Sequence, residues 1–318
     1  MKKVVVIGGG TGTYQVLTGL KNHNLDISAV ISMSDSGGST GKLRRELGML
    51  PPGDLRQAVL ALSNLPFAQK TLEKMFDFRF EKGKSLSGHS LGNILLAALT
   101  QITGSMDKAI EEAARILNVS GAIYPATITR THLVALLTDG SRVYGETNID
   151  KRKFKLAIPI KKVYLSPKAK VLPNAKKALE RADMIVIGPG DLYTSIVPVL
   201  LVDGVTKAIK KSKAKVAFVM NLVTKKAETQ GYKASDFVNE ITRYLQPAND
   251  RLSHVLVNKI SANRKSVIAW YKKYGSVPVE IDLKSSKEQK IIARDFLDKT
   301  TFFRHDPEKL ASVIVGLV

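Results

Sequence analysis

Two aspartates in separate turns are the residues of this sequence best suited to hold a metal ion. Asp35 precedes a run of serines and glycines at 36–39, and Asp54 follows the turn at 51–53. Carboxylates on neighbouring loops are suitable ligands for one Mg²⁺ beside a diphosphate. We therefore predict Asp35 and Asp54 as metal-binding and catalytic residues. Capping of the helix expected here is an alternative role for Asp54.

His89 is a third candidate for catalysis. It lies between Gly88 and Ser90, where an apolar helix is expected to begin. A lone histidine is more often structural than catalytic. A histidine that served only for packing would not be expected among glycines and serines. At a helix start an imidazole can donate a hydrogen bond to a phosphate or transfer a proton. We predict one of these functions for His89.

A glycine-dense turn early in the chain has the pattern of an anion-binding site. The β-branched run Val4–Ile7 predicts a strand buried on both faces, and the turn 8–13 separates it from an expected helix. Such a turn exposes free backbone N–H groups at the positive end of the helix dipole, where an anion is favoured. We expect Gly9 and its neighbours to hold phosphate. A tight connection without a ligand is the alternative.

The same turn does not have the pattern of a dinucleotide-binding site. In the motif G-x-G-x-x-G beginning at Gly8, the third glycine position holds Thr13. No acidic residue follows the second predicted strand in the position that usually binds the ribose. Phosphate is therefore predicted as the ligand, and NAD is not.

The loop 34–42 after the second predicted strand is similar to a P-loop, but the match fails at two positions. Ser36 holds the place of the first glycine, and Leu43 replaces the serine or threonine that would bind magnesium. An ATPase is therefore excluded. The glycines, hydroxyls and following arginines could still bind a phosphate or diphosphate; a glycine hinge with surface arginines is the alternative. The ligand-binding residues predicted here are Ser36, Gly37, Gly38, Ser39 and Arg44.

Strands and helices alternate along most of the chain, which predicts an α/β protein with a mostly parallel sheet. Buried strands are expected at 182–187 and 216–220, each followed by a polar loop. Open α/β sheets bind ligands at the carboxyl ends of their strands. The Gly-Pro-Gly turn after the first of these strands admits close approach of a ligand, and Thr194 and Ser195 place hydroxyls at a helix start.

From Gly121 the pattern changes to alternation with period two and includes the turn Asp139-Gly140. This pattern predicts a β-hairpin or meander rather than a strand–helix–strand unit. We expect a small β-meander insert or subdomain at 121–165, within one α/β domain that spans residues 1–318.

The composition is that of an ordinary globular protein. The 318 residues are 44% hydrophobic, which is enough for a full core. The lack of cysteine excludes disulfides, thiolate zinc sites and thiol nucleophiles. No stretch approaches the ~18 apolar residues of a membrane span, and the first apolar run is too short for a signal peptide. We expect a cytoplasmic protein.

The net charge of +21 is unevenly distributed. Between Lys151 and Arg181, eleven Lys and Arg stand against Glu180 alone. No aromatic residues interleave this run in the manner of a base-stacking surface, and no helix-turn-helix or finger spacing is present. Since lysine dominates, we predict a solvated basic face; binding of nucleic acid or of an anionic membrane surface is the alternative.

Five motifs occur in order along the chain: GGGTGT, SDSGGSTGKLR, PPGDLR, GHSLGN and IGPGDLYTS. Together they closely resemble the bacterial gluconeogenesis-factor family (YvcK-like), the branch related to the 2-phospho-L-lactate transferases (CofD). The resemblance runs from Val4 to about His305, nearly the whole chain. It implies a Rossmann-like three-layer fold in a cytoplasmic protein that forms a homodimer.

The transferase branch implies a Mg²⁺-dependent enzyme that moves a phospholactyl-type group from a guanosine diphosphate donor to a deazaflavin alcohol. By this resemblance Asp35 and Asp54 would be the carboxylates on the metal side. The residues that would cradle phosphates are Gly10, Thr11, Gly12 and Thr13. The residues that would contact the nucleotide or acceptor are Asn93, Gly188, Pro189, Gly190, Asp191, Tyr193, Thr194 and Ser195, and Asn221 after a neighbouring strand is a further candidate.

The gluconeogenesis-factor branch implies a protein that binds UDP-sugars and is needed for growth on gluconeogenic carbon sources and for normal cell shape. Tyr271 and Arg304 fall where that branch contacts the nucleotide sugar. The loop at Asp35 lacks the acidic pair expected in the transferases, so we predict a regulatory UDP-sugar-binding protein that links carbon supply to cell-wall synthesis. A transferase acting on a nucleotide diphosphate, with Mg²⁺ as its metal, is the alternative; no other cofactor is expected.

Overall fold

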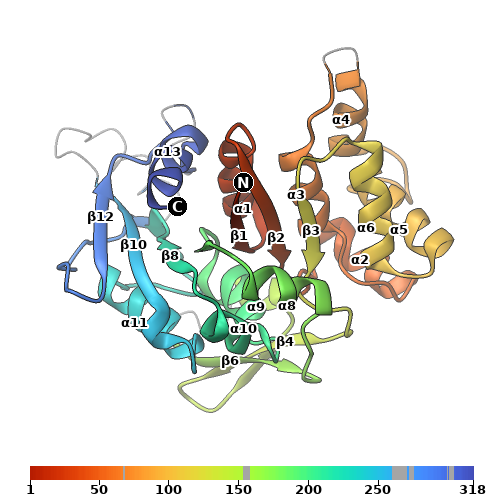
Figure 1. Ribbon diagram of the computed structural model, residues 1–318. Helices are drawn as coiled ribbons and strands as arrows, with labels where there is room; N and C mark the ends of the chain where they lie inside the picture. Colours follow the sequence, from red (N-terminus) through yellow and green to blue (C-terminus); the bar gives the residue numbers. More distant parts are fainter. Residues whose placement is uncertain (67–68, 153–157, 260–270, 272–275, 299, 301–303) are drawn as a thin grey trace.

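Seven parallel strands form the central sheet of the protein (Figure 1). The computed structural model describes residues 1–66, 69–152, 158–259, 271, 276–298, 300 and 304–318. The strands, in their order across the sheet, are β12 (Lys290–Arg294), β10 (Leu252–Asn258), β8 (Lys215–Val219), β7 (Met184–Ile187), β1 (Lys2–Gly8), β2 (Leu25–Ile31) and β3 (Ala122–Pro125). Each neighbouring pair runs parallel, which confirms the predicted α/β class with a mostly parallel sheet.

β1 lies inside this sheet and is covered on both faces. Val4 and Val6 pack into the hydrophobic core on one side of the sheet, and Val5 and Ile7 pack into the core on the other. All of these side chains are buried. The β-branched run is therefore continuous because neither face of the strand meets solvent.

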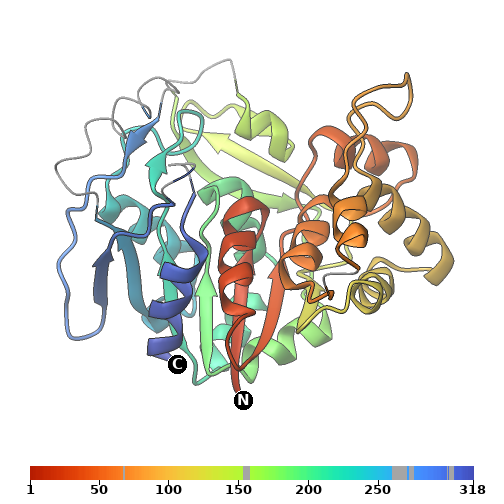
Figure 2. The ribbon, with the colours of Figure 1, turned by 90° about the horizontal axis from the view of Figure 1, so that it is seen from above.

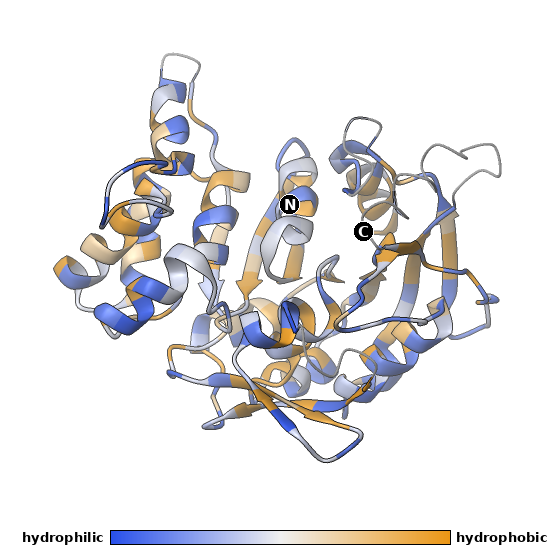
Figure 3. Ribbon diagram, turned by 180° about the vertical axis from the view of Figure 1, so that it is seen from behind, coloured by the Kyte–Doolittle hydropathy of each residue, from blue (hydrophilic) through white to orange (hydrophobic). Residues whose placement is uncertain are grey.

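The fold has three layers, with the sheet between two layers of helices (Figures 1 and 3). One face is covered by α1 (Gly10–Leu20), α3 (Gly53–Leu62) and α13 (Pro307–Leu317), with α2 (Gly38–Glu46), α4 (Lys70–Asp77), α5 (Leu91–Thr103) and α6 (Met106–Ile116) next to them. The other face is covered by α8 (Pro173–Glu180), α9 (Val197–Leu200), α10 (Val205–Lys211) and α11 (Ala234–Tyr244). In the part of the chain that the structure describes, no helix combines the length and apolarity needed to cross a membrane.

Several short elements complete the fold. Those that follow the carboxyl ends of the strands are α7 (Glu146–Asp150), the π-helical turn η2 (Leu192–Ile196), and the two-stranded antiparallel sheet of β9 (Val223–Thr224) and β11 (Val277–Pro278). The 3₁₀ turn η3 (Asn249–Arg251) lies at the opposite end of the sheet, directly before β10.

A separate antiparallel sheet contains β5 (Arg142–Tyr144), β4 (His132–Leu137) and β6 (Ile160–Ser166) in that order. We expected the meander to begin at Gly121, but β3 instead pairs parallel with β2 at the edge of the main sheet. The reason is that buried and half-buried residues alternate along β3. A strand at the edge of a parallel sheet can thus show the same period-two pattern as a meander strand.

The order of the strands reverses at β1. From β1 the chain proceeds to β2 and β3 on one side, then returns to β7 beside β1 and continues outward through β8, β10 and β12. Figure 2 shows α1 over this central region, with α13 packed beside it. In open α/β sheets a crevice for ligands opens at the carboxyl ends of the strands where the order reverses. Here those ends lead into the turn after Gly8 and the loop after Ile187.

Candidate functional site

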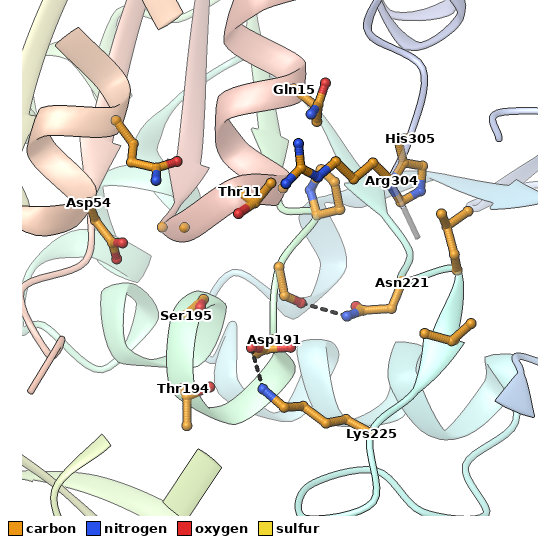
Figure 4. A pocket seen from close by; sticks show the side chains of 18 of the residues that line it. Thr11, Gln15, Asp54, Asp191, Thr194, Ser195, Asn221, Lys225, Arg304 and His305 are labelled. Carbon is orange, nitrogen blue, oxygen red and sulfur yellow. Dashed lines mark hydrogen bonds and ion pairs between the residues drawn. The ribbon is translucent and has the colours of Figure 1, made fainter. Parts of the chain in front are cut away.

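A cavity of about 560 Å³ lies at this point of the sheet (Figure 4). Its size and its mixed polar and apolar lining are typical of a small-molecule site. The lining residues are Gly9, Gly10, Thr11, Gly12, Gln15, Asp35, Asp54, Gln57, Glu146, Pro189, Gly190, Asp191, Thr194, Ser195, Asn221, Leu222, Val223, Thr224, Lys225, Ser276, Arg304 and His305. The turn after β1 and the loops after β2, β7 and β8 therefore meet around one space.

α1 begins at this cavity with free backbone donors. Its N-cap residue, Gly9, makes no side-chain capping bond. The N–H of Gly10 donates to the Asp54 carboxylate, and Thr11 and Gly12 line the cavity. The first N–H groups of a helix lack partners within the helix, and the helix dipole favours an anion beside them. The turn thus presents donors of the kind that a phosphate requires.

Close contacts explain two of the glycines in this turn. A Cβ atom added at Gly12 would lie 2.3 Å from the carbonyl oxygen of Pro189, and one added at Gly9 would lie 2.4 Å from Asp54 Oδ2. The turn after β1 is therefore packed directly against the loop after β7. Thr13 is buried, and its hydroxyl donates to the Gly9 carbonyl at 3.2 Å. Thr13 supports the turn from behind and does not line the cavity.

Four carboxylates line this cavity, and three of them come from segments other than the loop after β7, which carries Asp191. Asp35 follows β2, Glu146 begins α7, and Asp54 lies in the first turn of α3, where Pro52 rather than Asp54 holds the N-cap position. Burial, followed by repulsion from Asp35 and Glu146, raises the pKa of Asp54 to about 8. Burial and repulsion from Asp35 likewise raise the pKa of Glu146. Oxygen ligands of this kind suit Mg²⁺, and a divalent cation would relieve their repulsion. Among the described residues these three side chains do not bring their ligand atoms within 4.8 Å of one another, so the metal site at Asp35 and Asp54 stays a prediction.

A second group of carboxylates surrounds the ammonium of Lys225. Its Nζ donates to Asp191 Oδ2 at 2.6 Å and to Asp150 Oδ1, and it lies 3.6 Å from Glu228 Oε1. Of the residues described by the structure, these three acids form the one group of three or more His, Asp and Glu residues with ligand atoms within 4.8 Å of one another. Because the lysine pairs with all of them, its ammonium occupies the position that a metal ion would take.

The loop after β7 forms a wall of the cavity. Asn221 Nδ2 donates to the Gly190 carbonyl at 2.7 Å and fixes the loop to the end of β8 (Figure 4). Thr194 Oγ1 donates to Glu228 Oε1 at 2.8 Å. Gly188 has a φ of +72°, a conformation that glycine adopts without strain. These contacts hold the predicted loop residues Pro189, Gly190, Asp191, Thr194 and Ser195 at the cavity surface.

Tyr193, predicted as a ligand contact in the same loop, points into the core instead. Its side chain is fully buried, and its hydroxyl shares a hydrogen bond of 2.8 Å with that of Tyr232. Its backbone N–H donates to Glu228 Oε2 at 2.8 Å. Tyr193 therefore anchors the loop and does not line the cavity.

A smaller compartment of about 310 Å³ adjoins the main cavity and shares Asp35, Asp54 and Glu146 with it. Its other predicted lining residues are Gly37, Gly38, Ser39 and Asn93. His89 lies behind this wall, where its Nδ1 shares a hydrogen bond of 2.9 Å with Ser39 Oγ. The Asn93 side-chain amide donates to the same hydroxyl at 3.3 Å. His89 thus contacts this compartment only through Ser39, and its predicted function stays a prediction.

Arg304 extends toward Thr11 at the entrance to the α1 turn (Figure 4). The next residue, His305, is buried, and its Nε2–H donates a hydrogen bond of 3.1 Å to the Met220 carbonyl. Burial lowers the pKa of His305 to about 4, so its imidazole is neutral at pH 7. Arg304 therefore supplies a positive charge near the free donors of α1.

Three further predicted site residues do not line the main cavity, in addition to Thr13, Tyr193 and the residues of the smaller compartment. Tyr271 is fully buried, and its carbonyl accepts a hydrogen bond of 3.0 Å from the N–H of Ser276, which does line the cavity. Ser36 and Arg44 line a separate cavity. The structure thus brings Asp35, Asp54 and the loops after β1 and β7 together around the main cavity, and these three residues are not part of its lining.

Sequence reasoning missed several residues of the cavity. Helical spacing could have indicated Gln15, one turn after Thr11, and Gln57, which follows Asp54 by three residues. Glu146 and Lys225 have no such signal, because they come from segments far along the chain that only the folded arrangement brings to this place.

The described basic residues of the run 151–181 are exposed, with the exception of Arg152. Residues 153–157 lie outside the described residues. Arg152 is buried, and its Nη2 donates to the Ala227 carbonyl at 2.8 Å. The lysines of β6 and α8 are exposed, namely Lys161, Lys162, Lys176 and Lys177. The solvated basic face stays a prediction for these exposed lysines.

Comparisons with known proteins agree on one family. The family model described as 2-phospho-L-lactate transferase CofD matches residues 4–297. A putative gluconeogenesis factor of Thermotoga maritima is 45% identical over 98% of both chains. The gluconeogenesis factor of Bacillus subtilis is 37% identical over 99% of this chain and 98% of its own.

A solved structure gives the same result. Protein BH3568 of Bacillus halodurans, described as a member of the UPF0052 family, is 40% identical over 99% of both chains, with a TM-score of 0.91. With its parallel sheet, its cavity at the strand reversal and these full-length matches, the chain belongs to the gluconeogenesis-factor (UPF0052) family, within the wider CofD family.

Proposed function

We propose that this protein binds a UDP-sugar in the cavity at the carboxyl ends of β1 and β7, as a regulatory protein. Its role would be to link carbon supply to cell-wall synthesis, so that cells lacking it grow poorly on gluconeogenic carbon sources and lose their normal shape. The names of its relatives support the gluconeogenic part of this proposal. The observation that carries the binding proposal is the start of α1 at the cavity wall, where Thr11 and Gly12 line the cavity and the N-cap residue Gly9 has no side chain to cap the helix.

The diphosphate is the part of the ligand that this site explains best. Free N–H groups of the α1 turn would donate hydrogen bonds to its oxygens, as they do in other phosphate sites at helix N-termini. Arg304 beside Thr11 supplies a guanidinium that can bind two phosphate oxygens at once. The hydroxyl groups of Thr194 and Ser195 line the opposite wall. The volume of about 560 Å³ leaves room for a nucleoside and a sugar on either side.

We further propose that Mg²⁺ accompanies the diphosphate. Asp35, Asp54 and Glu146 line the same cavity as the α1 turn, so a diphosphate bound there without a cation would meet their negative charge. A divalent ion held by carboxylate oxygens on one side and phosphate oxygens on the other removes this conflict. Its part would be to bridge the ligand and the loops after β2 and before α3.

Calorimetric titration of the purified protein with UDP-N-acetylglucosamine, with and without MgCl₂, tests the proposal. We expect saturable binding that tightens with Mg²⁺ and is weaker for GDP and for NAD. Arg304→Gln should weaken the binding of the UDP-sugar, and Arg181→Gln, which removes the same charge from an exposed position outside the cavity, should not. Lack of binding at millimolar ligand would refute the proposal.

The regulatory part needs a test in cells. Expression of this chain in a bacterium that lacks its own gluconeogenesis factor should restore growth on a gluconeogenic carbon source and restore cell shape. A variant that folds but no longer binds the UDP-sugar should restore neither. If that variant fully restored growth and cell shape, the cellular role would not depend on ligand binding, and the proposal would be contradicted.

A transferase is the second candidate, and the three carboxylates favour it. Asp35, Asp54 and Glu146 could hold the Mg²⁺ that a transfer from a nucleotide diphosphate requires. The test is incubation with a phospholactyl guanosine diphosphate donor, a deazaflavin alcohol and Mg²⁺, with product followed by mass spectrometry. If the natural chain forms the product and Asp54→Asn does not, the protein is a transferase. If the natural chain forms no product, the transferase is excluded.

We also propose that the protein works as a homodimer in the cytoplasm. What supports a dimer is the set of exposed apolar side chains on and beside α4, which projects from the body of the molecule (Figure 1): Leu72, Met75, Phe78 and Leu86. Light scattering on a size-exclusion column should give twice the mass of the chain. A monomer at micromolar concentration would contradict the proposal.

A further inference from the structure

A second cavity, of about 540 Å³, adjoins the loop after β2 and is lined by arginines. Arg44 and Arg45 come from the last turn of α2. Arg130 and His132 come from the segment that leads into β4. No aspartate or glutamate is among the described residues that line this cavity. The space is therefore surrounded by positive charge from two separate elements.

One of the guanidinium groups is held in place by the backbone. The Nη2 of Arg44 donates to the carbonyl of Thr131. The guanidinium of Arg130 lies close to Gly48, where an added Cβ would stand 3.1 Å from Nη1. Gly48 itself has a φ of +59°, a conformation that favours glycine. The Arg44 guanidinium is thus fixed at the cavity wall, and the exposed Arg130 side chain lies near the end of α2.

Within the described residues, the arginines of this cavity form no ion pair with a carboxylate, although the charge of Asp35 acts on Arg44 from a longer distance. In the described part of the chain, the ion pairs of arginines with carboxylates belong to Arg56, Arg115 and Arg243. Burial and the charge of Arg130 lower the pKa of Arg44, against an opposing effect of Asp35. Burial and the charge of Arg44 lower the pKa of His132. An anion in this cavity would relieve the repulsion among these cations.

We propose that this cavity binds the phosphate group of a small phosphate ester, independently of the nucleotide cavity. A phosphate offers three oxygens that can accept from donors in different directions, which matches guanidinium groups on separate elements. A carboxylate has two coplanar oxygens and is suited to a single guanidinium fork. Met49 and Tyr144 line the same cavity and provide apolar surface for the body of the ester.

One wall separates the two cavities. Ser36 lines the arginine cavity, and its N–H donates to Glu146 Oε2, which lines the nucleotide cavity, at 3.2 Å. Ser36 Oγ also accepts from the Thr147 N–H at 3.0 Å. Because the cavities are distinct, a ligand of the arginine cavity should be displaced by neither UDP-sugar nor Mg²⁺.

Titrations with inorganic phosphate and with glucose 6-phosphate, at constant ionic strength, test the proposal. We expect saturable binding of both, tighter for the ester, and no binding of glucose. The double variant Arg45→Gln/Arg130→Gln should weaken binding by about tenfold or more, since it removes two charge-assisted donors. Both side chains are exposed, so the variant should fold with an unchanged melting temperature. Arg130→Glu alone should abolish binding and is a second test if the double variant is unstable.

Two control variants assign the site. Arg181→Gln removes one positive charge from an exposed position elsewhere and should leave glucose 6-phosphate affinity unchanged. Arg304→Gln removes a charge from the nucleotide cavity and should also leave it unchanged. Weakening by Arg304→Gln and not by the double variant would place the phosphate in the nucleotide cavity and overturn the proposal. The proposal is also overturned if neither inorganic phosphate nor glucose 6-phosphate binds at millimolar concentration.

Discussion

The ammonium of Lys225 donates a hydrogen bond of 2.6 Å to the carboxylate of Asp191 and is at the same time the counter-charge of Asp150 and Glu228. Glu228 in turn accepts from the backbone N–H of Tyr193 and the hydroxyl of Thr194 in the loop after β7. One lysine thus links the loop after β8 to the loop that forms a wall of the nucleotide cavity.

Replacement of Lys225 should destabilise the protein, because it leaves three carboxylates without a counter-charge. Breaking a buried pair costs about 3 kcal/mol or more, and the partial exposure of Lys225 reduces this to about 2 kcal/mol. Urea unfolding of Lys225→Met at pH 7 measures the loss. The deficit should shrink on acidification, because protonated carboxylates no longer repel one another. Lys226→Met, an exposed neighbour, is the control, and an equal loss in both variants would contradict this account.

The close packing between α1 and the loop after β7 predicts opposite effects of two glycine-to-alanine substitutions. Gly12→Ala would place a methyl group 2.3 Å from the Pro189 carbonyl oxygen, so we expect a loss of about 2 kcal/mol and of ligand binding. Gly316→Ala, in α13 with no atom within 4 Å of the new methyl, should stabilise by up to about 1 kcal/mol. Thermal unfolding checks both. A tolerated Gly12→Ala would show that the turn is not packed as described.

Asp54 is predicted to favour ligand binding at the expense of stability. Its folded-state pKa of about 8 exceeds the unfolded value near 3.8, so the folded state binds the extra proton and stability falls as pH rises between these values. Asp54→Asn removes this loss and should raise the melting temperature at pH 8, while it abolishes the Mg²⁺-dependent part of ligand affinity. Asp26→Asn, at an exposed position, should do neither. A lower melting temperature for Asp54→Asn would contradict this prediction.

His305 should contribute a loss of stability in acid. Its folded pKa is about 4 and its unfolded pKa is near 6.5, so between these values the unfolded state binds more protons and stability falls as pH decreases. The full effect is about 3 kcal/mol, reached near pH 4. Urea unfolding from pH 7 to pH 4 should show this fall in the natural chain and a shallower one in His305→Asn. Identical pH profiles would show that His305 is not buried as a neutral imidazole.

Local sequence patterns were sufficient for the parts of the site that depend on the sheet. The β-branched run 4–7 and the glycines after it predicted a buried central strand with a turn at its carboxyl end, and the run before Gly188 did the same for β7. Since β1 and β7 are neighbours, their turns meet. Patterning could not place Glu146 or Lys225, whose position depends on how α7 and the loop after β8 fold back over these turns.

The sequence also could not predict which side chains of a correctly predicted loop point into the cavity. Tyr193 and Thr194 are adjacent in the π-helical turn η2, yet Tyr193 is buried in the core and Thr194 lines the cavity. His89 was predicted to meet a ligand, and it lies one residue behind the wall, against Ser39. The residue types indicated which loops form the site, and the packing of each loop decided which side chains reach it.

The most direct test of the central claim is a crystal structure of the protein with UDP-N-acetylglucosamine and Mg²⁺. This account predicts the diphosphate within hydrogen-bond distance of the N–H groups of Thr11 and Gly12, with the metal ion between it and Asp35 or Asp54. A diphosphate bound elsewhere, such as at Arg44 and Arg130, or an empty nucleotide cavity at saturating ligand, would contradict it.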